Sequence, residues 1–104
     1  MTGKHFYLQP QATVLNAVSD LAELQKGKFT YSDTPNGVIH FMVRLYHNKW
    51  EFKFLVRDTG KNTSCVEIEI DGNDEQAESL INRQYALLES MMLENLKIEF
   101  AKDA

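Results

Sequence analysis

The chain has few of the residues that build redox, metal and phosphate-binding sites. Cys65 is its single cysteine, so no disulfide can form within the chain, and a reducing compartment is indicated. The three histidines show no HxH or HxxxH spacing, which gives no metal site to expect. No glycine-rich loop joins an expected strand to an expected helix, so no phosphate cradle is predicted. We therefore expect no metal and no cofactor.

Long apolar runs and an excess of basic residues are also absent. No run approaches the roughly 20 apolar residues of a membrane helix, and the first residues, MTGKHFYLQP, lack the apolar core of a secretion signal. We therefore expect a cytoplasmic protein that makes no membrane contact. The net charge is −4, and this mild acidity disfavours nonspecific binding to nucleic acid, which depends on a basic surface.

The composition present is that of an ordinary globular domain. Hydrophobic residues make up 43% and charged residues 25% of the chain. A length of 104 residues is near the usual size of one domain, so we expect a single domain over residues 1–104. Five glycines and two prolines mark the expected turns.

Turn residues and apolar spacing divide the chain into strands and helices. Alternating or β-prone runs predict strands over residues 5–9, 28–33, 38–46, 50–57 and 65–71. Helical spacing predicts a first helix from Pro10 to Lys26, closed by Gly27 as a left-handed cap. A second helix of about 25 residues is predicted after Asn73 as its N-cap. The predicted order is β-α-β-β-β-β-α.

The apolar residues of these elements predict the architecture. Each helix has one apolar stripe and the sheet has one strongly apolar face, and these surfaces must be buried together. The prediction is an α+β two-layer sandwich, with an antiparallel sheet of four to five strands and both helices on one face. This order of elements resembles half of the TATA-binding-protein-like or helix-grip architectures. The resemblance implies a fold and no functional residue.

The segment from Gly37 to Asp58 predicts a hairpin with one uncovered face. A two-residue turn at Asn48–Lys49 would pair Phe41 with Val56 and place core-type residues opposite one another. The uncovered face would then carry three rows of neighbours: His40–Arg57–Cys65, Met42–Leu55–Glu67 and Arg44–Lys53–Glu69.

Apolar side chains on this uncovered face suggest a contact surface. A cluster of them on a flat sheet is typical of a partner-binding site, although scattered exposed apolar residues are also ordinary. The candidate partner-binding residues are Val38, His40, Met42, Arg44, Tyr46, Lys53, Leu55 and Arg57.

One predicted row has the residue types of nucleophilic catalysis. An arginine beside Cys65 would favour the reactive thiolate, and His40 could act as a base. These two residues would lie two strands apart, about 9.5 Å, which is too far for a direct hydrogen bond. We therefore predict no catalytic residue and no enzyme.

The first functional hypothesis is a small binding module without catalytic activity. It would be a homodimer that uses the uncovered sheet face for contact with itself or with another protein or peptide, because two-fold dimers are the commonest soluble oligomers. The second helix supports this, since about 25 residues span about 37 Å, whereas an eight-residue strand spans only about 27 Å.

The alternative hypothesis is a binder of a small apolar ligand. The ligand would lie between the second helix and the sheet, where Gln84 and Asn95 interrupt the apolar stripe and could form a polar floor. The expected lining is Tyr85, Leu88, Met91 and Met92, because methionine side chains give adaptable walls. The other interpretation of Gln84 and Asn95 is partial exposure.

Overall fold

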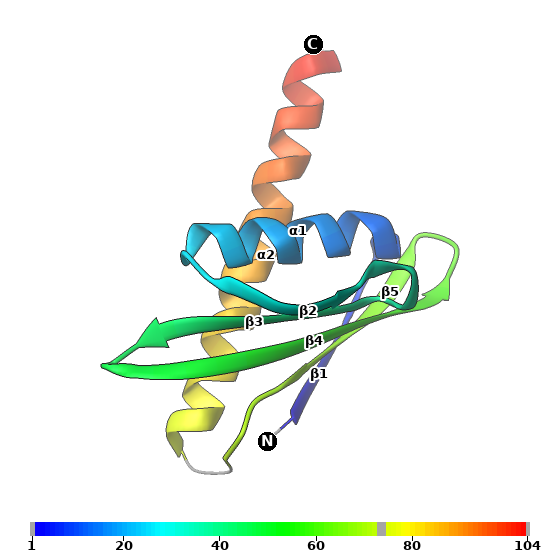
Figure 1. Cartoon of the computed structure of the whole chain (residues 1–104). Helices are drawn as coiled ribbons and strands as arrows, with labels where there is room; N and C mark the ends of the chain where they lie inside the picture. Colours follow the sequence, from blue (N-terminus) through cyan, green and yellow to red (C-terminus); the bar gives the residue numbers. More distant parts are fainter. Residues whose placement is uncertain (1, 73–74, 104) are drawn as a thin grey trace.

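A five-stranded antiparallel sheet and two helices make up the fold (Figure 1). The computed structural model describes residues 2–72 and 75–103. In chain order the elements are β1 (Thr2–Tyr7), α1 (Gln11–Leu24), β2 (Lys28–Asp33), the short 3-10 turn η1 (Thr34–Asn36), β3 (Val38–Leu45), β4 (Asn48–Gly60), β5 (Thr63–Glu69) and α2 (Glu75–Asp103). The strands lie in the order β1-β5-β4-β3-β2. The predicted fold class and element order are confirmed.

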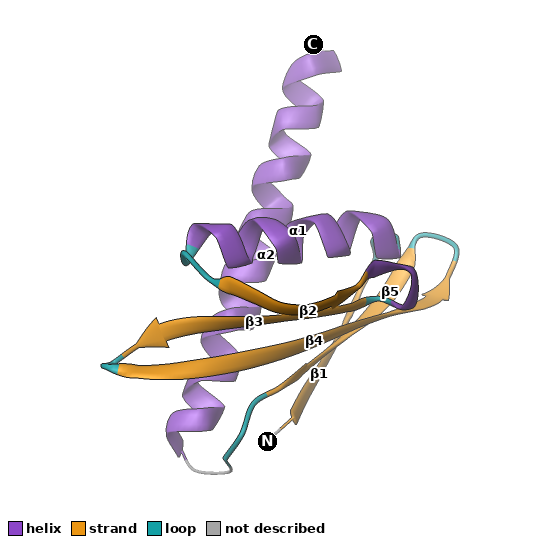
Figure 2. Cartoon of the chain, viewed as in Figure 1, coloured by secondary structure: helices purple, strands orange, loops and turns teal. Residues whose placement is uncertain are grey.

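The core lies between the two helices and one face of the sheet, which we call the inner face. Both helices cross on this side, and α2 runs behind the strands in the view of Figure 2. Three phenylalanine rings fill its centre: Phe41 lies 5.3 Å from Phe54 and 5.8 Å from Phe52 between ring centroids. Among the described side chains, the apolar stripes of both helices are buried as predicted, except that Leu24 is exposed at the end of α1 and Met91 of α2 is only partly buried.

The hairpin between β3 and β4 turns two residues earlier than predicted. Tyr46 and His47 form the turn, and both have left-handed backbone, with φ of 53° and 67°. Positive φ at both central residues is what the tightest common hairpin turn requires. Beside the turn, the indole Nε1 of Trp50 donates a hydrogen bond to the Leu45 carbonyl at 3.3 Å.

This correction has a simple geometric cause. In the structure Phe41 faces Phe52, whereas the predicted Asn48–Lys49 turn would have paired Phe41 with Val56. Moving the turn by two residues shifts the pairing by four, so every side chain keeps its face of the sheet. The alternation of apolar and polar residues therefore fits both registers equally well.

The other side of β4 has the predicted register. Val56 pairs with Val66, and Phe54 pairs with Ile68. These pairs face the helices and are fully buried. The middle of the sheet is therefore positioned as the sequence predicts.

An irregularity in β2 overturns a smaller prediction. Strict alternation over the predicted strand 28–33 would place Phe29 and Tyr31 on one face, but the pairing shifts between them. Phe29 therefore lies opposite Phe41 on the inner face, and Tyr31 lies opposite His40 on the outer face. A bulge adds one unpaired residue, which inverts the alternation beyond it.

The helix ends differ from the prediction in two respects. The left-handed residue after α1 is Lys26, with φ of 57°, and not Gly27. Gly27 is instead a place of close approach, because a Cβ there would lie 3.0 Å from the Ala22 carbonyl oxygen. The predicted N-cap Asn73 lies outside the described residues.

The second helix is longer than predicted and extends past α1. It comprises 29 residues, and its C-terminal part projects from the body of the protein in Figure 1. At 1.5 Å per residue this is about 43 Å of helix. Within the described part of the chain, no helix is both long and apolar enough to cross a membrane.

Candidate functional site

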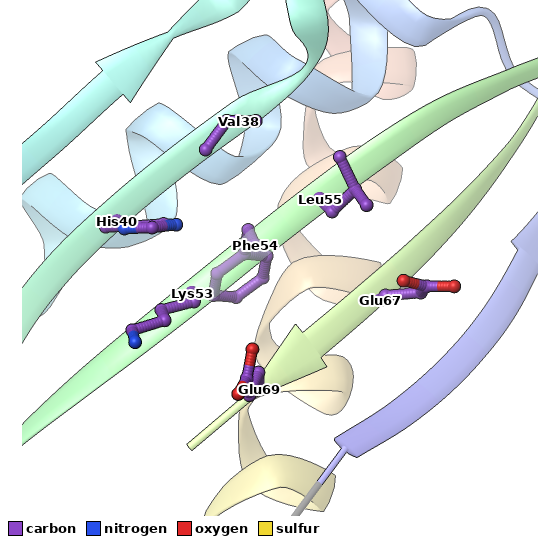
Figure 3. A pocket seen from close by; sticks show the side chains of 7 residues that line it. All are labelled: Val38, His40, Lys53, Phe54, Leu55, Glu67 and Glu69. Atoms are coloured by element: carbon purple, nitrogen blue, oxygen red, sulfur yellow. The ribbon is translucent and has the colours of Figure 1, made fainter. Parts of the chain in front are cut away.

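The face of the sheet opposite the core, which we call the outer face, is not covered by either helix. Figure 3 views this face, and both helices lie behind the sheet. Val38, His40 and Met42 of β3 alternate with the buried residues of that strand, and all three are only partly buried. On β4, Lys53 and Leu55 likewise alternate with buried phenylalanine and valine. The outer face is therefore a surface on which these strands present side chains together.

An open pocket of about 210 Å³ lies at the centre of the outer face (Figure 3). Val38 lies directly opposite Leu55, and Leu55 lies opposite Glu67, so one cross-strand row supplies three of the seven lining residues. The lining residues are Val38, His40, Lys53, Phe54, Leu55, Glu67 and Glu69. The pocket thus combines apolar and charged side chains.

Some of the charged side chains around this pocket form ion pairs, and others do not. Glu67 accepts Lys4 Nζ at 3.2 Å and lies 3.7 Å from an Arg57 guanidinium nitrogen. Lys53 and Glu69 lie opposite each other on neighbouring strands, yet among the described residues they form no ion pair within 4 Å. A cation and an anion of the outer face are therefore available to a partner.

The structure brings together four of the eight predicted binding residues. Val38, His40, Lys53 and Leu55 line the pocket. Met42 shares the face but lies opposite Glu51, so a row containing His40 separates it from Leu55. The structure therefore groups four of the predicted residues around one pocket, and their role in binding stays a prediction.

The remaining predicted residues lie at the margins. Arg44 lies opposite Lys49 near the hairpin end. Tyr46 is in the turn and is exposed, so it is not the strand residue that was predicted. Arg57 lies beyond Leu55 on β4, opposite Cys65.

The register of the hairpin changes all three predicted rows. His40 lies opposite Lys53 and not Arg57, so the row with Cys65 does not form. The Cys65 side chain is also only 3% exposed. The corrected rows are His40–Lys53–Glu69, Val38–Leu55–Glu67 and Arg57–Cys65.

Three lining residues, Phe54, Glu67 and Glu69, were not predicted as binding residues. Glu67 and Glu69 alternate with the buried residues of β5, so their place on the outer face follows from the sequence. The predicted rows already placed Glu67 beside Leu55 and Glu69 beside Lys53, and the structure has the same two pairs. These pairs were the signal that could have identified both glutamates.

The space between α2 and the sheet is occupied by side chains. Gln84 is fully buried, so the prediction of partial exposure is wrong for this residue. Its amide exchanges two hydrogen bonds with Gln25, at 2.9 Å and 2.8 Å. The Gln84 amide therefore faces a partner from the end of α1. The side chain of Asn95 is not among those that the structure describes.

Tyr85 and Leu88, which were expected to line a ligand cavity, are packed in the core. The Tyr85 hydroxyl donates to the Val66 carbonyl at 3.0 Å. Burial raises the pKa of Tyr85 well above its usual value, because the phenolate would lose its water. A ligand in this layer would have to displace these side chains.

The inner side of β1 carries a cluster that the sequence does not indicate. The His5 ring stacks on Tyr85 with ring centroids 3.6 Å apart. Tyr7 donates a hydrogen bond to Glu89 at 3.0 Å, and burial followed by this acidic neighbour raises the pKa of Tyr7 strongly. The partners in this contact are separated by 82 residues in the sequence, so no local pattern marks them.

The described residues contain no group of three or more His, Cys, Asp or Glu side chains that could hold a metal ion. Two of the histidines contact aromatic rings: His5 lies against Tyr85, and His40 lies 5.3 Å from Tyr31 between ring centroids. The two polar side-chain atoms that are buried without a partner among the described residues are Gln9 Oε1 and the Ser64 hydroxyl oxygen.

Comparison with known proteins gives a likeness of fold. No protein-family model and no curated protein matches the sequence. Among solved structures, Ara h 8.0201 matches with a TM-score of 0.51 at 9% identity, over 93% of this chain and 97% of that one. The match shows a shared fold. It supports the helix-grip type of layout that the element order predicts.

Two further solved structures have lower TM-scores. A START superfamily protein from Mycobacterium smegmatis matches with a TM-score of 0.49 at 10% identity, over 93% of this chain and 96% of that one. The di-domain ARO/CYC StfQ from the steffimycin biosynthetic pathway matches with a TM-score of 0.48 at 11% identity. That match covers 88% of this chain and 42% of StfQ.

Proposed function

We propose that this protein is a small homodimeric binding module without catalytic activity, and that the outer face of its sheet is the contact surface. The observation that carries the proposal is the pocket at the centre of this face, where Val38 and Leu55 lie in the row next to Lys53 and Glu69. Among the described residues, neither Lys53 nor Glu69 has an ion-pair partner within 4 Å. Apolar side chains ringed by charge are typical of specific protein contacts.

The size of the face supports this proposal. Five strands about 4.8 Å apart, with an average length of eight residues, give a surface roughly 20 Å by roughly 27 Å. Side-chain relief enlarges the accessible area of such a surface beyond its flat dimensions. A stable interface buries about 800 Å² on each partner, so the outer face is of the required order.

The arrangement of charge favours a second copy of the chain as the occupant. Lys53 and Glu69 lie in the same row on the neighbouring strands β4 and β5. A two-fold axis between two stacked faces, parallel to these strands, would place Lys53 of each copy over Glu69 of the other. A two-fold interface needs this self-complementarity, and the paired charges would fix its register.

Reversing the charge of Lys53 tests this arrangement. Lys53→Glu places an acidic side chain over each Glu69, which makes two like-charge pairs in the proposed dimer, and we expect association to weaken about tenfold or more. The double variant Lys53→Glu with Glu69→Lys exchanges the charges and should restore association. Sedimentation velocity over a range of protein concentrations measures both effects.

The control is Arg83→Glu, a charge reversal on the exposed side of α2. This variant should associate like the unaltered protein, because the proposed interface does not include the helices. A monomer at every concentration would overturn the proposal. Equal weakening by Arg83→Glu and Lys53→Glu would also contradict it, since it would indicate a general effect of net charge.

The alternative of an apolar ligand between α2 and the sheet has less support. Its expected lining residues Tyr85, Leu88 and Met92 are buried in the core, and Gln84 is satisfied by Gln25. An increase in the fluorescence of an apolar dye, lost in a variant that fills this layer, would favour the ligand over the dimer.

A further inference from the structure

The two edges of the sheet are protected to different degrees. β2 has a bulge between Phe29 and Tyr31 and begins and ends with charged residues, features that discourage pairing with another chain. β1, at the opposite edge, pairs with β5 residue by residue from Thr2 to Tyr7 without a shift. Its other edge lies at the margin of the sheet, and the one lysine of this strand, Lys4, is paired with Glu67 at 3.2 Å. A strand edge without a bulge can accept a further strand.

The most exposed large apolar side chains of the described residues lie at the end of β1. Leu8 is 89% exposed and Phe6 is 70% exposed. Phe6 lies on the outer face, in the row of Cys65 and Arg57. Exposure of this extent at an unpaired edge is unfavourable in water, and it marks a place where a partner gains binding energy.

A pocket of about 220 Å³ lies beside these two residues. It is lined by Phe6, Tyr7, Leu8, Thr59, Thr63 and Ser64, from the end of β1 and the β4–β5 hairpin. Cavities of about 150 Å³ hold a benzene molecule, so this volume suits one apolar side chain. The pocket can therefore accept one residue of a strand laid along β1.

The Ser64 hydroxyl group indicates that the wall of this pocket lacks a hydrogen-bond partner. Its side chain is fully buried, and its hydroxyl oxygen has no hydrogen-bond partner among the described residues. Buried hydroxyl groups are nearly always partnered in folded proteins. A polar group brought into the pocket wall by a bound segment would correct this deficit.

The charge at the inner side of β1 indicates the chemistry of the segment. Glu89 is half exposed and lies 3.5 Å from His5 and 3.0 Å from Tyr7. On the outer side, Lys4 is neutralised by Glu67 at 3.2 Å. A bound strand would therefore meet an acidic side chain on one face and apolar side chains on the other.

We propose that the free edge of β1 binds an extended segment of a partner protein as a sixth strand of the sheet. Successive side chains of a strand point to opposite faces. The segment therefore alternates apolar residues, which contact Phe6 and enter the pocket, with lysine or arginine residues, which face Glu89. Main-chain hydrogen bonds to β1 supply the affinity, and the alternation supplies the specificity. This proposal is independent of the outer-face dimer.

A synthetic peptide tests the proposal. The probe is acetyl-Lys-Phe-Lys-Val-Lys-amide, titrated into the 15N-labelled protein. We expect amide shift changes along β1 and over residues 59–64, and slower hydrogen exchange of the β1 amides. The same peptide with N-methyl groups on alternate residues should not bind, because it cannot form the strand hydrogen bonds. Equal binding of the N-methylated peptide would overturn strand addition.

Matched variants locate the site. Leu8→Ser should weaken peptide binding about tenfold through lost apolar contact, whereas Leu24→Ser, a similarly exposed leucine at the end of α1, should have no effect. Glu89→Gln should weaken the lysine peptide more than the same peptide with glutamine in place of lysine. Equal effects of Leu8→Ser and Leu24→Ser, or shift changes confined to another region, would refute the site.

The dimer and the peptide can be tested separately. Lys53→Glu should leave peptide binding unchanged, and Leu8→Ser should leave the sedimentation of the free protein unchanged. A loss of self-association in Leu8→Ser would show that a second copy of the chain occupies the β1 edge, which would overturn the proposal of a separate partner.

Discussion

At the scale of single residues, the pair of Gln25 and Gln84 joins the two helices. Each amide donates to the other, and Gln25 also donates to the Leu21 carbonyl at 3.3 Å. Gln84 lies in an apolar stripe whose other members bury methyl and ring groups. A polar group in this place is tolerated because its partner satisfies it, and the pair sets the position of α1 along α2.

We expect Gln84→Leu to lower the free energy of unfolding by about 1–3 kcal/mol, because the Gln25 amide loses its partner in a partly buried place. The double variant Gln84→Leu with Gln25→Leu should lose less than the sum of the two single changes. Urea unfolding of the unaltered protein, the two single variants and the double variant gives the free energies of unfolding for this comparison. Additive losses would mean that the two amides contribute independently.

The buried tyrosines make a prediction about alkaline pH. The pKa of Tyr85 is raised above its unfolded value of 10.0, chiefly by burial, so the unfolded chain releases this proton more readily. The stability that the neutral phenol provides is complete below pH 10 and is lost as the pH rises above it. Urea unfolding between pH 9 and pH 11 should show a steeper loss in the unaltered protein than in Tyr85→Phe.

The control for this experiment is Tyr46→Phe, since Tyr46 is exposed in the hairpin turn. Its unfolding free energy should follow the same pH dependence as the unaltered protein. If Tyr85→Phe showed that dependence too, the phenol of Tyr85 would not be the group responsible.

At the scale of elements, the β3–β4 hairpin determines which residues meet on the outer face. Its turn uses two residues, Tyr46 and His47, in a backbone conformation that favours glycine or asparagine. Neither residue signals a turn in the sequence, whereas Asn48 does. The pairing over the eight residues of β3 and the Trp50 contact with Leu45 outweigh this local cost.

We expect His47→Gly to raise the free energy of unfolding by about 0.5–1 kcal/mol, because glycine adopts a φ of 67° without a steric penalty. Lys49→Gly should lower it, because Lys49 is a strand residue opposite Arg44. Thermal unfolding of the two variants compares the registers directly. The opposite result would favour a turn at Asn48–Lys49.

At the scale of the whole molecule, the sequence predicts the layers well and their lateral alignment less well. The inner face follows from alternation in β3, β4 and β5, and among the described side chains both apolar helix stripes are buried with the exception of Leu24 and the partly buried Met91. These predictions succeed because the buried face of a strand or helix follows from the spacing of apolar residues within that element alone. The fold class could therefore be predicted without knowing which residues are in contact.

The contacts that the sequence does not reveal depend on register or on distant parts of the chain. The His40–Lys53 row requires the correct hairpin turn, since a shift of four residues keeps every face unchanged. The Tyr7–Glu89 and Gln25–Gln84 bonds join residues that are far apart in the chain. Four of the eight predicted binding residues line the pocket, since their side chains share a face of the sheet in either register, and their role in binding stays a prediction.

The enclosure of Cys65 has a practical consequence. Its thiol lies between β1 and β4 on the middle residues of a row, and very little of it reaches solvent. An alkylating reagent can reach it only after the first strand has detached from its neighbour. The rate at which Cys65 is alkylated therefore reports how often β1 separates from β5. A molecule that binds along β1 and holds it in the sheet should lower this rate.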